Sequence, residues 1–186
     1  MEQEWMPFII SIKTALTATM ITFFLGIFAA NKINKINPKH KGILDSLFTL
    51  PMVLPPTVIG FFLLVILGRN GFIGKMLYSM GINVIFSWGA TVIAAVVVSF
   101  PLMYSTAKGA FEQIDKNILN AAQTMGVSNF KIFWKIMIPL AWPGIAAGTI
   151  LSFARALGEF GATLMIAGNI PGKTQTIPLA IYFAAE

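Results

Sequence analysis

The stretch PFIISIKTALTATMITFFLGIFAA, residues 7–30, decides the fold class of this chain. As an α-helix it is long and apolar enough to cross the hydrocarbon core of a membrane, which takes about 20 residues. Three other stretches have the same character, at residues 45–67, 84–107 and 140–167. Backbone groups in lipid must be hydrogen-bonded internally, and membrane barrels show short alternating strands instead, so four transmembrane helices are predicted. The sequence therefore predicts an all-α membrane protein, a polytopic helical bundle in one domain, residues 1–186.

The composition excludes several classes of protein. Hydrophobic residues make up 56% of the 186 residues, against roughly 45–50% in an average soluble domain. The chain has no cysteine, which excludes disulfides and cysteine-ligated metals. The net charge is +6, but the basic residues lie mostly at the ends of the apolar stretches and do not form one water-facing patch. We therefore expect the chain to contact lipid and not nucleic acid.

The combinations of residues that make an active site or a metal site are also missing. His40 is the one histidine, and it has no cysteine or carboxylate neighbour at ligand spacing. The apolar stretches offer no serine–histidine or paired-aspartate combination, and no H-E-x-x-H occurs. We therefore predict no catalytic residues, no metal site and no cofactor bound by this chain.

Basic residues predict the orientation of the helices, because cytoplasmic loops carry an excess of them. One side of the predicted membrane holds eight: Lys32, Lys35, Lys39, Lys41, Lys108, Lys116, Lys131 and Lys135. The other side holds three: Arg69, Lys75 and Lys173. We therefore expect a cell-membrane (plasma or inner-membrane) protein with its N-terminus outside and the loop at residues 108–139 in the cytoplasm.

The two ends of the chain carry separate predictions. Glu2 and Glu4 stand where a cleaved signal would have basic residues, so the first apolar stretch is interpreted as a retained span. The last residues, IPLAIYFAAE (177–186), stop where another apolar run could begin. We expect a further transmembrane helix to be missing at the C-terminus.

The loop at 108–139 contains two short amphipathic segments. Apolar residues recur at helical spacing before and after Gly126: Ile114, Ile118, Ala121, Ala122, Met125, then Phe130, Phe133, Trp134, Met137. Glycine readily closes a helix, and Ser128 or Asn129 can cap the next one. Two short helices joined at Gly126 are therefore predicted, with Pro139 and Pro143 near the start of the next span. Such helices lie on lipid headgroups or dock in a groove of another protein.

The spacing of this loop resembles that of ABC importer permeases. Their pattern is E-A-A, three residues, Gly, nine residues, I-x-L-P, and the matching positions here are Asn120, Ala121, Ala122, Gly126, Ile136, Ile138 and Pro139. Asn120 stands in place of Glu and Ile138 in place of Leu. In that family the loop is the coupling helix that contacts the ATPase. Residues 54–71 and 153–182 are also similar to molybdate permease subunits, and sulfate permeases share much of the pattern.

The resemblance implies the type I ABC importer permease fold and a set of partners. Two copies of the chain would form a homodimer. Cytoplasmic ATPase subunits would use ATP and Mg, and an extracytoplasmic binding protein would deliver a tetrahedral oxyanion. The implied substrate is molybdate or tungstate, with sulfate or thiosulfate as the alternative. Closure of the ATPases would drive alternating access. An intramembrane hydrolase and a passive scaffold are the alternatives from other classes.

Two groups of residues inside the apolar stretches are candidates for the translocation route. Arg155 and Glu159 are four residues apart, about 6 Å on one helix face, and an unpaired charge in lipid costs about 2.5 kcal/mol or more. They either form a neutralising pair that locks the bundle or line the route, with a bend at the neighbouring glycines. Pro55 and Pro56 predict a kink that could act as a gate, and the Thr57 hydroxyl could contact the anion. Kinks are also predicted at two further prolines, Pro51 and Pro101.

Overall fold

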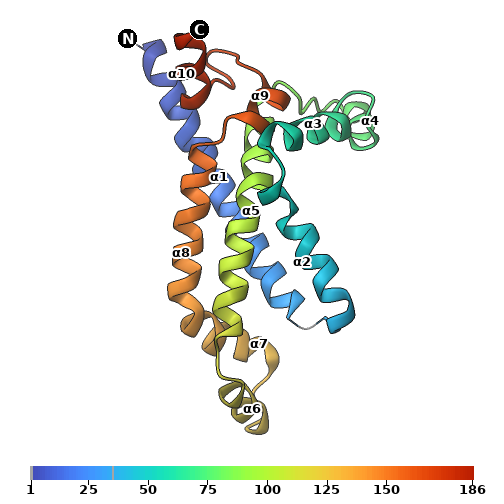
Figure 1. Cartoon of the computed structure of the whole chain (residues 1–186), viewed down its shortest axis with the longest axis vertical. Helices are drawn as coiled ribbons and strands as arrows, with labels where there is room; N and C mark the ends of the chain where they lie inside the picture. Colours follow the sequence, from blue (N-terminus) through green and yellow to red (C-terminus); the bar gives the residue numbers. More distant parts are fainter. Residues whose placement is uncertain (1, 35) are drawn as a thin grey trace.

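Three long helices form the centre of the bundle in this computed structural model, which describes residues 2–34 and 36–186. They are α1 (Glu2–Ile33), α5 (Trp88–Glu112) and α8 (Ile138–Leu157). Helix α5 packs against both of the others, and the three run side by side along the molecule (Figure 1). The described residues contain helices and no strand, so the predicted all-α class is confirmed.

The shorter helices lie around this centre. Their bounds are α2 Pro38–Val53, α3 Pro56–Leu67, α4 Phe72–Ser79, α6 Lys116–Thr124, α7 Asn129–Ile132, the π-helix η1 Phe133–Met137, α9 Gly161–Ala167 and α10 Ile177–Ala185. Figure 1 shows α6 and α7 at one end of the bundle, with α9, α10 and both termini at the other. Helices α3 and α4 extend sideways near the end that carries the termini. Lys35 lies outside the described residues, as do the side chains of Glu2, Glu4 and Lys39.

The described residues include three helices long and apolar enough to cross a membrane, Trp5–Ile33, Trp88–Glu112 and Asn129–Leu157. A fourth span results if the bent pair His40–Val53 and Pro56–Leu67 is counted as one. The chain bends by 111° between these two helices. The expected span at 45–67 is therefore broken at residues 54–55, not a single rod.

The break follows from the two adjacent prolines. Neither Pro55 nor Pro56 has a backbone N–H, so neither can continue the hydrogen bonding of α2. A residue before proline is pushed toward extended backbone, and Pro55 has φ −55° and ψ 136°. Pro101 has a different outcome, because α5 continues through it to Glu112.

One of the two prolines after the loop lies where the sequence predicts it. Pro139 is in the first turn of α8, as expected for the start of a span, whereas Pro143 lies inside that helix. Helix α8 is also preceded without a break by α7 and η1, so one helical run extends from Asn129 to Leu157. The N–H of Ile138 bonds to the Phe133 carbonyl, five residues back, as in a π-helix. This wider turn comes directly before Pro139, where an α-helical donor is missing.

Small residues set the spacing of the central helices. A Cβ added to Gly26 of α1 would lie 2.7 Å from Cγ of Met103 on α5. Buried Thr14 and Thr91 share a hydrogen bond of 3.1 Å between the same two helices. Close approach at small residues and hydroxyl bonds across helices are how spans associate in lipid. The Nζ atom of Lys13 lies 4.2 Å from the centre of the Trp88 ring.

Candidate functional site

Helix α6 is closed at both ends by local hydrogen bonds. The Asp115 carboxylate accepts from the backbone N–H of Asn117 at 2.8 Å. At the other end the Gly126 N–H bonds to the Gln123 carbonyl at 2.9 Å, and the Val127 N–H bonds to the Ala122 carbonyl at 3.1 Å. Gly126 has φ +75°. This combination is the Schellman ending of a helix. The predicted break at Gly126 and the short helix before it are confirmed, but the second helix is not short, because α7 continues through η1 into α8.

Gly126 is required by its backbone conformation and not by crowding. A Cβ added there would meet no atom within 4 Å. The left-handed region costs other L-residues about 1–2 kcal/mol. Asparagine tolerates it better than β-branched residues do, since its short polar side chain can bond locally.

The rest of the family motif lies on and just after this turn. Asn120 and Ala121 are exposed, whereas Ala122 faces inward and is buried. Ile136 lies in η1, and Ile138 and Pro139 begin α8, so the last part of the motif belongs to the long helix and not to a separate loop.

Large apolar side chains lie uncovered around the turn. Met125 is 82% exposed and Phe130 is 74% exposed. Ile118 and Trp134 are exposed as well, whereas Ile114 and Ile132 are buried. The apolar face predicted for the loop is therefore divided, with one part packed on the bundle and the other part without a partner among the described residues.

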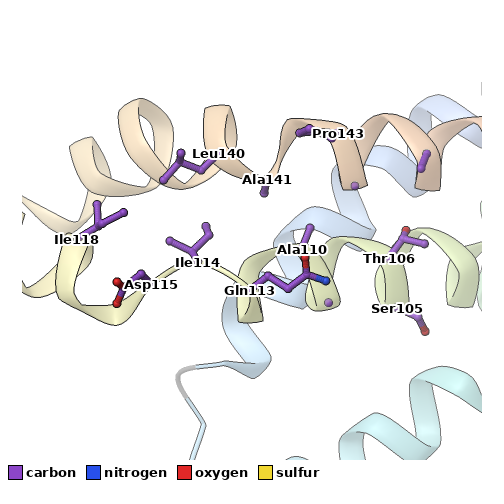
Figure 2. A pocket seen from close by; sticks show the side chains of 13 residues that line it. Ser105, Thr106, Ala110, Gln113, Ile114, Asp115, Ile118, Leu140, Ala141 and Pro143 are labelled. Atoms are coloured by element: carbon purple, nitrogen blue, oxygen red, sulfur yellow. The ribbon is translucent and has the colours of Figure 1, made fainter.

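A cavity of about 620 Å³ lies between α5, the start of α6, and α8. Figure 2 shows α8 on one side of it, with the end of α5 and the start of α6 on the other. Its polar side chains are those of Ser105, Thr106, Gln113 and Asp115. Helix α6 therefore borders open space instead of packing tightly on both long helices.

The charged pair predicted inside the fourth stretch spans a break in the helix. Helix α8 ends at Leu157 and α9 begins at Gly161. Arg155 Nη1 donates to Glu159 Oε2 at 2.7 Å, and Glu159 Oε1 accepts from the Ala162 N–H at 2.7 Å. The sequence suggested two charges on one continuous helix face. The structure has Arg155 on α8 and Glu159 in the linker, where Glu159 joins α8 to the first turn of α9.

The two broken helices touch close to their breaks. A Cβ on Gly60 of α3 would lie 2.7 Å from Met165 Cβ and 2.8 Å from Ala162 Cα on α9. A Cβ on Gly161 would lie 3.1 Å from the Thr57 backbone nitrogen. At Gly60 a side chain would fit only if the two helices moved apart, and at Gly161 the neighbours would have to shift by a few tenths of an ångström.

The candidate residues therefore form two groups at opposite ends of the bundle. Pro56 and Arg155 line one cavity of about 180 Å³, Thr57 contacts α9, and Pro55 precedes α3. The motif residues from Asn120 to Pro139 lie at the other end, with α6 and α7 (Figure 1).

Sequence reasoning missed a polar network between α2 and α5. Lys108 Nζ donates to Asp45 Oδ2 at 2.6 Å, and the Tyr104 hydroxyl donates to the other oxygen of Asp45. Lys41 pairs with Glu112 at 2.9 Å one turn further along. In the sequence the two lysines indicate only the orientation of the spans. The one signal in the sequence was Asp45, a lone carboxylate at the start of the second apolar stretch that needed a charge partner.

Comparison with known proteins shows the family of this chain. Residues 22–184 match the family described as binding-protein-dependent transport system inner membrane component. The chain belongs to this family. The resemblance to ABC importer permeases predicted from residues 54–71, 120–139 and 153–182 is thereby confirmed.

Among this chain's relatives within the family are proteins named for molybdenum transport. The putative molybdenum transport system permease protein YvgM of Bacillus subtilis is 49% identical over 97% of this chain and 80% of its own length. The molybdenum transport system permease protein ModB of Escherichia coli K12 is 46% identical over the same shares. The probable sulfate transport system permease protein cysT of Chlorokybus atmophyticus is 35% identical over 96% of this chain and 63% of its own length.

Proposed function

We propose that this chain is the membrane-spanning permease subunit of an ATP-driven importer of a tetrahedral oxyanion, molybdate or tungstate. The observation that carries the proposal is the closed turn at Gly126, which presents exposed Met125 and Phe130 at one end of a bundle of apolar helices. An uncovered apolar surface of this kind fits a protein groove. Molybdenum is supported by the names of relatives at 49% and 46% identity, against 35% for the sulfate permease relative.

In the proposed complex, the chain itself has no catalytic role. Two copies form the pathway, and two cytoplasmic ATPase subunits that bind ATP and Mg hold the α6–α7 turns. An extracytoplasmic binding protein delivers the anion to the end that carries α9 and α10. Closure of the ATPases draws the turns together and switches the pathway between its inward-open and outward-open forms, with the N-terminus outside.

Reconstitution tests the substrate. The chain would be placed in lipid vesicles with its cognate ATPase and binding protein, and ATP hydrolysis and anion uptake would be measured with molybdate, tungstate, sulfate and thiosulfate. Stimulation by molybdate or tungstate supports the proposal. Stimulation by sulfate or thiosulfate alone would assign the chain to the alternative substrate. Turnover of a substrate without the ATPase would indicate a hydrolase. Absence of both anion uptake and substrate turnover would indicate that the chain is a passive scaffold.

Two substitutions at one position test coupling through the turn. Gly126→Val places a β-branched residue at φ +75°, where the penalty of at least about 1–2 kcal/mol lowers the equilibrium constant for the native turn roughly five- to thirtyfold. We expect oxyanion-stimulated ATP hydrolysis to fall, with this factor as the upper limit of the effect. Gly126→Asn is the control, since asparagine enters this conformation more readily, and it should retain most of the activity. Equal activity of the two variants would contradict coupling through this turn.

A further inference from the structure

The pair of Arg155 and Glu159 presents its two charges unequally. Both oxygens of Glu159 are bonded, one to Arg155 and one to the Ala162 N–H, and the side chain is only 2% exposed. The side chain of Arg155 is 31% exposed. A guanidinium carries five N–H donors, and within residues 2–34 and 36–186 this one has a single hydrogen-bond partner. The cation of the pair therefore keeps unused donors, while the carboxylate is enclosed.

Arg155 lines the cavity formed at the proline break of the other broken helix. This space of about 180 Å³ is bordered by Pro51, Met52, Leu54, Pro56, Val98, Leu102 and Arg155. Arg155 is the one charged side chain in that set, and the rest are apolar. Glu159 is not among the lining residues, since its oxygens point to α8 and α9. An anion in the cavity would contact the guanidinium of Arg155 without contacting the carboxylate of Glu159.

We infer that this cavity is a transient binding site for a tetrahedral divalent oxyanion, held by the free N–H donors of Arg155. The inference rests on the proposed function and names the residue that holds the anion during passage. The planar guanidinium presents parallel donors that fit two oxygens of an oxyanion, as a lysine would not. The opposite wall is apolar, so binding depends on one side chain and stays weak. Weak binding is what passage needs, since the anion must leave as well as enter.

Cysteine labelling tests the site, because the chain has no cysteine of its own. Leu102→Cys places one thiol in the cavity wall, and Ile43→Cys places one on α2, where Ile43 is 69% exposed and outside the cavity. Each variant would be assembled with its ATPase and binding protein in vesicles and labelled with N-ethylmaleimide in tungstate, sulfate or chloride at equal ionic strength. At an anion concentration of about twice the dissociation constant, an occupied site should slow labelling of the Leu102→Cys variant about threefold. Chloride should not protect this thiol, and the Ile43→Cys variant should not respond to any of the anions.

Substitution of Arg155 completes the test. Arg155→Lys keeps a cation beside Glu159 but loses the planar donors, and it should abolish most of the protection of the Leu102→Cys thiol. Arg155→Gln should abolish all of it. An unchanged Tm of each Arg155 variant in detergent shows that the fold is retained. Protection of the cavity thiol that survives Arg155→Gln, or equal protection by chloride, would overturn the site.

Failure of the site is distinguishable from failure of the proposed function. Uptake of molybdate or tungstate by the unsubstituted complex, without protection of the Leu102→Cys thiol, would refute the site and support the transport function. In that case the spare donors of Arg155 are satisfied by water. Absence of uptake with every oxyanion would refute the function, whatever the labelling shows.

Discussion

The close crossing of α3 and α9 predicts a destabilising effect of Gly60→Ala. The added Cβ would lie 2.7 Å from Met165 Cβ, 2.8 Å from Ala162 Cα and 2.9 Å from the Ala162 carbonyl oxygen. Two of these atoms belong to the backbone of α9, so the helices must move apart. Overpacking of this kind costs about 1–3 kcal/mol, and alanine regains about 1 kcal/mol of helix propensity. Because the contacts are to backbone, we expect a net loss of about 1–2 kcal/mol.

Gly42→Ala is the matched control, with the opposite sign. Gly42 lies in α2 and has no atom within 4 Å of an added Cβ, so only the propensity gain of about 1 kcal/mol remains. For a chain of this size each kcal/mol shifts the Tm by about 2–4 °C. Thermal unfolding in detergent should therefore show a Tm lowered by about 2–8 °C for Gly60→Ala and raised for Gly42→Ala. A Gly60→Ala protein as stable as the parent would refute the interpretation that α3 and α9 are locked together.

Three further predictions concern other parts of the bundle. Asp45→Asn and Lys108→Met should each lower the Tm, but together they should cost less than their sum, and a double-mutant cycle should give a coupling of about 1–3 kcal/mol. Ser87→Ala removes the side chain that accepts from the Ala90 N–H at the start of α5, and thermal unfolding should show a loss of about 0.5–1 kcal/mol. Met125→Cys should react with a membrane-impermeant maleimide from the cytoplasmic side alone, and labelling from outside would reverse the proposed orientation.

Features set by neighbouring residues could be predicted from the sequence. Glycine at residue 126 predicted the end of one short helix and the start of another, and it has the expected positive φ. Adjacent prolines at 55 and 56 predicted a kink, and the structure bends by 111° there. Arg155 and Glu159 predicted a pair, and the pair is formed. Each of these depends on backbone sterics or on a separation of a few residues.

Features set by distant residues could not be predicted. Lys108 and Asp45 are 63 positions apart in the sequence, and Gly60 and Ala162, which lie close together, are about 100 positions apart. Contact between two helices depends on which faces meet. A membrane helix that is apolar around its whole circumference gives no periodic signal of its buried face.

The continuity of the helix from α7 to α8 connects the two candidate groups mechanically. It runs from Asn129, beside the Gly126 turn, to Leu157, beside Arg155, a length of about 43 Å at helical rise. An element of this kind transmits displacement with little loss, whereas a flexible loop at residues 130–139 would absorb it. In the proposed mechanism, movement of the α6–α7 turn therefore reaches the cavity at Arg155 as movement of a nearly rigid helix. The helices are interrupted at residues 54–55 and 158–160, which are places where bending is easiest, and Glu159 holds the second of these together through both of its oxygens.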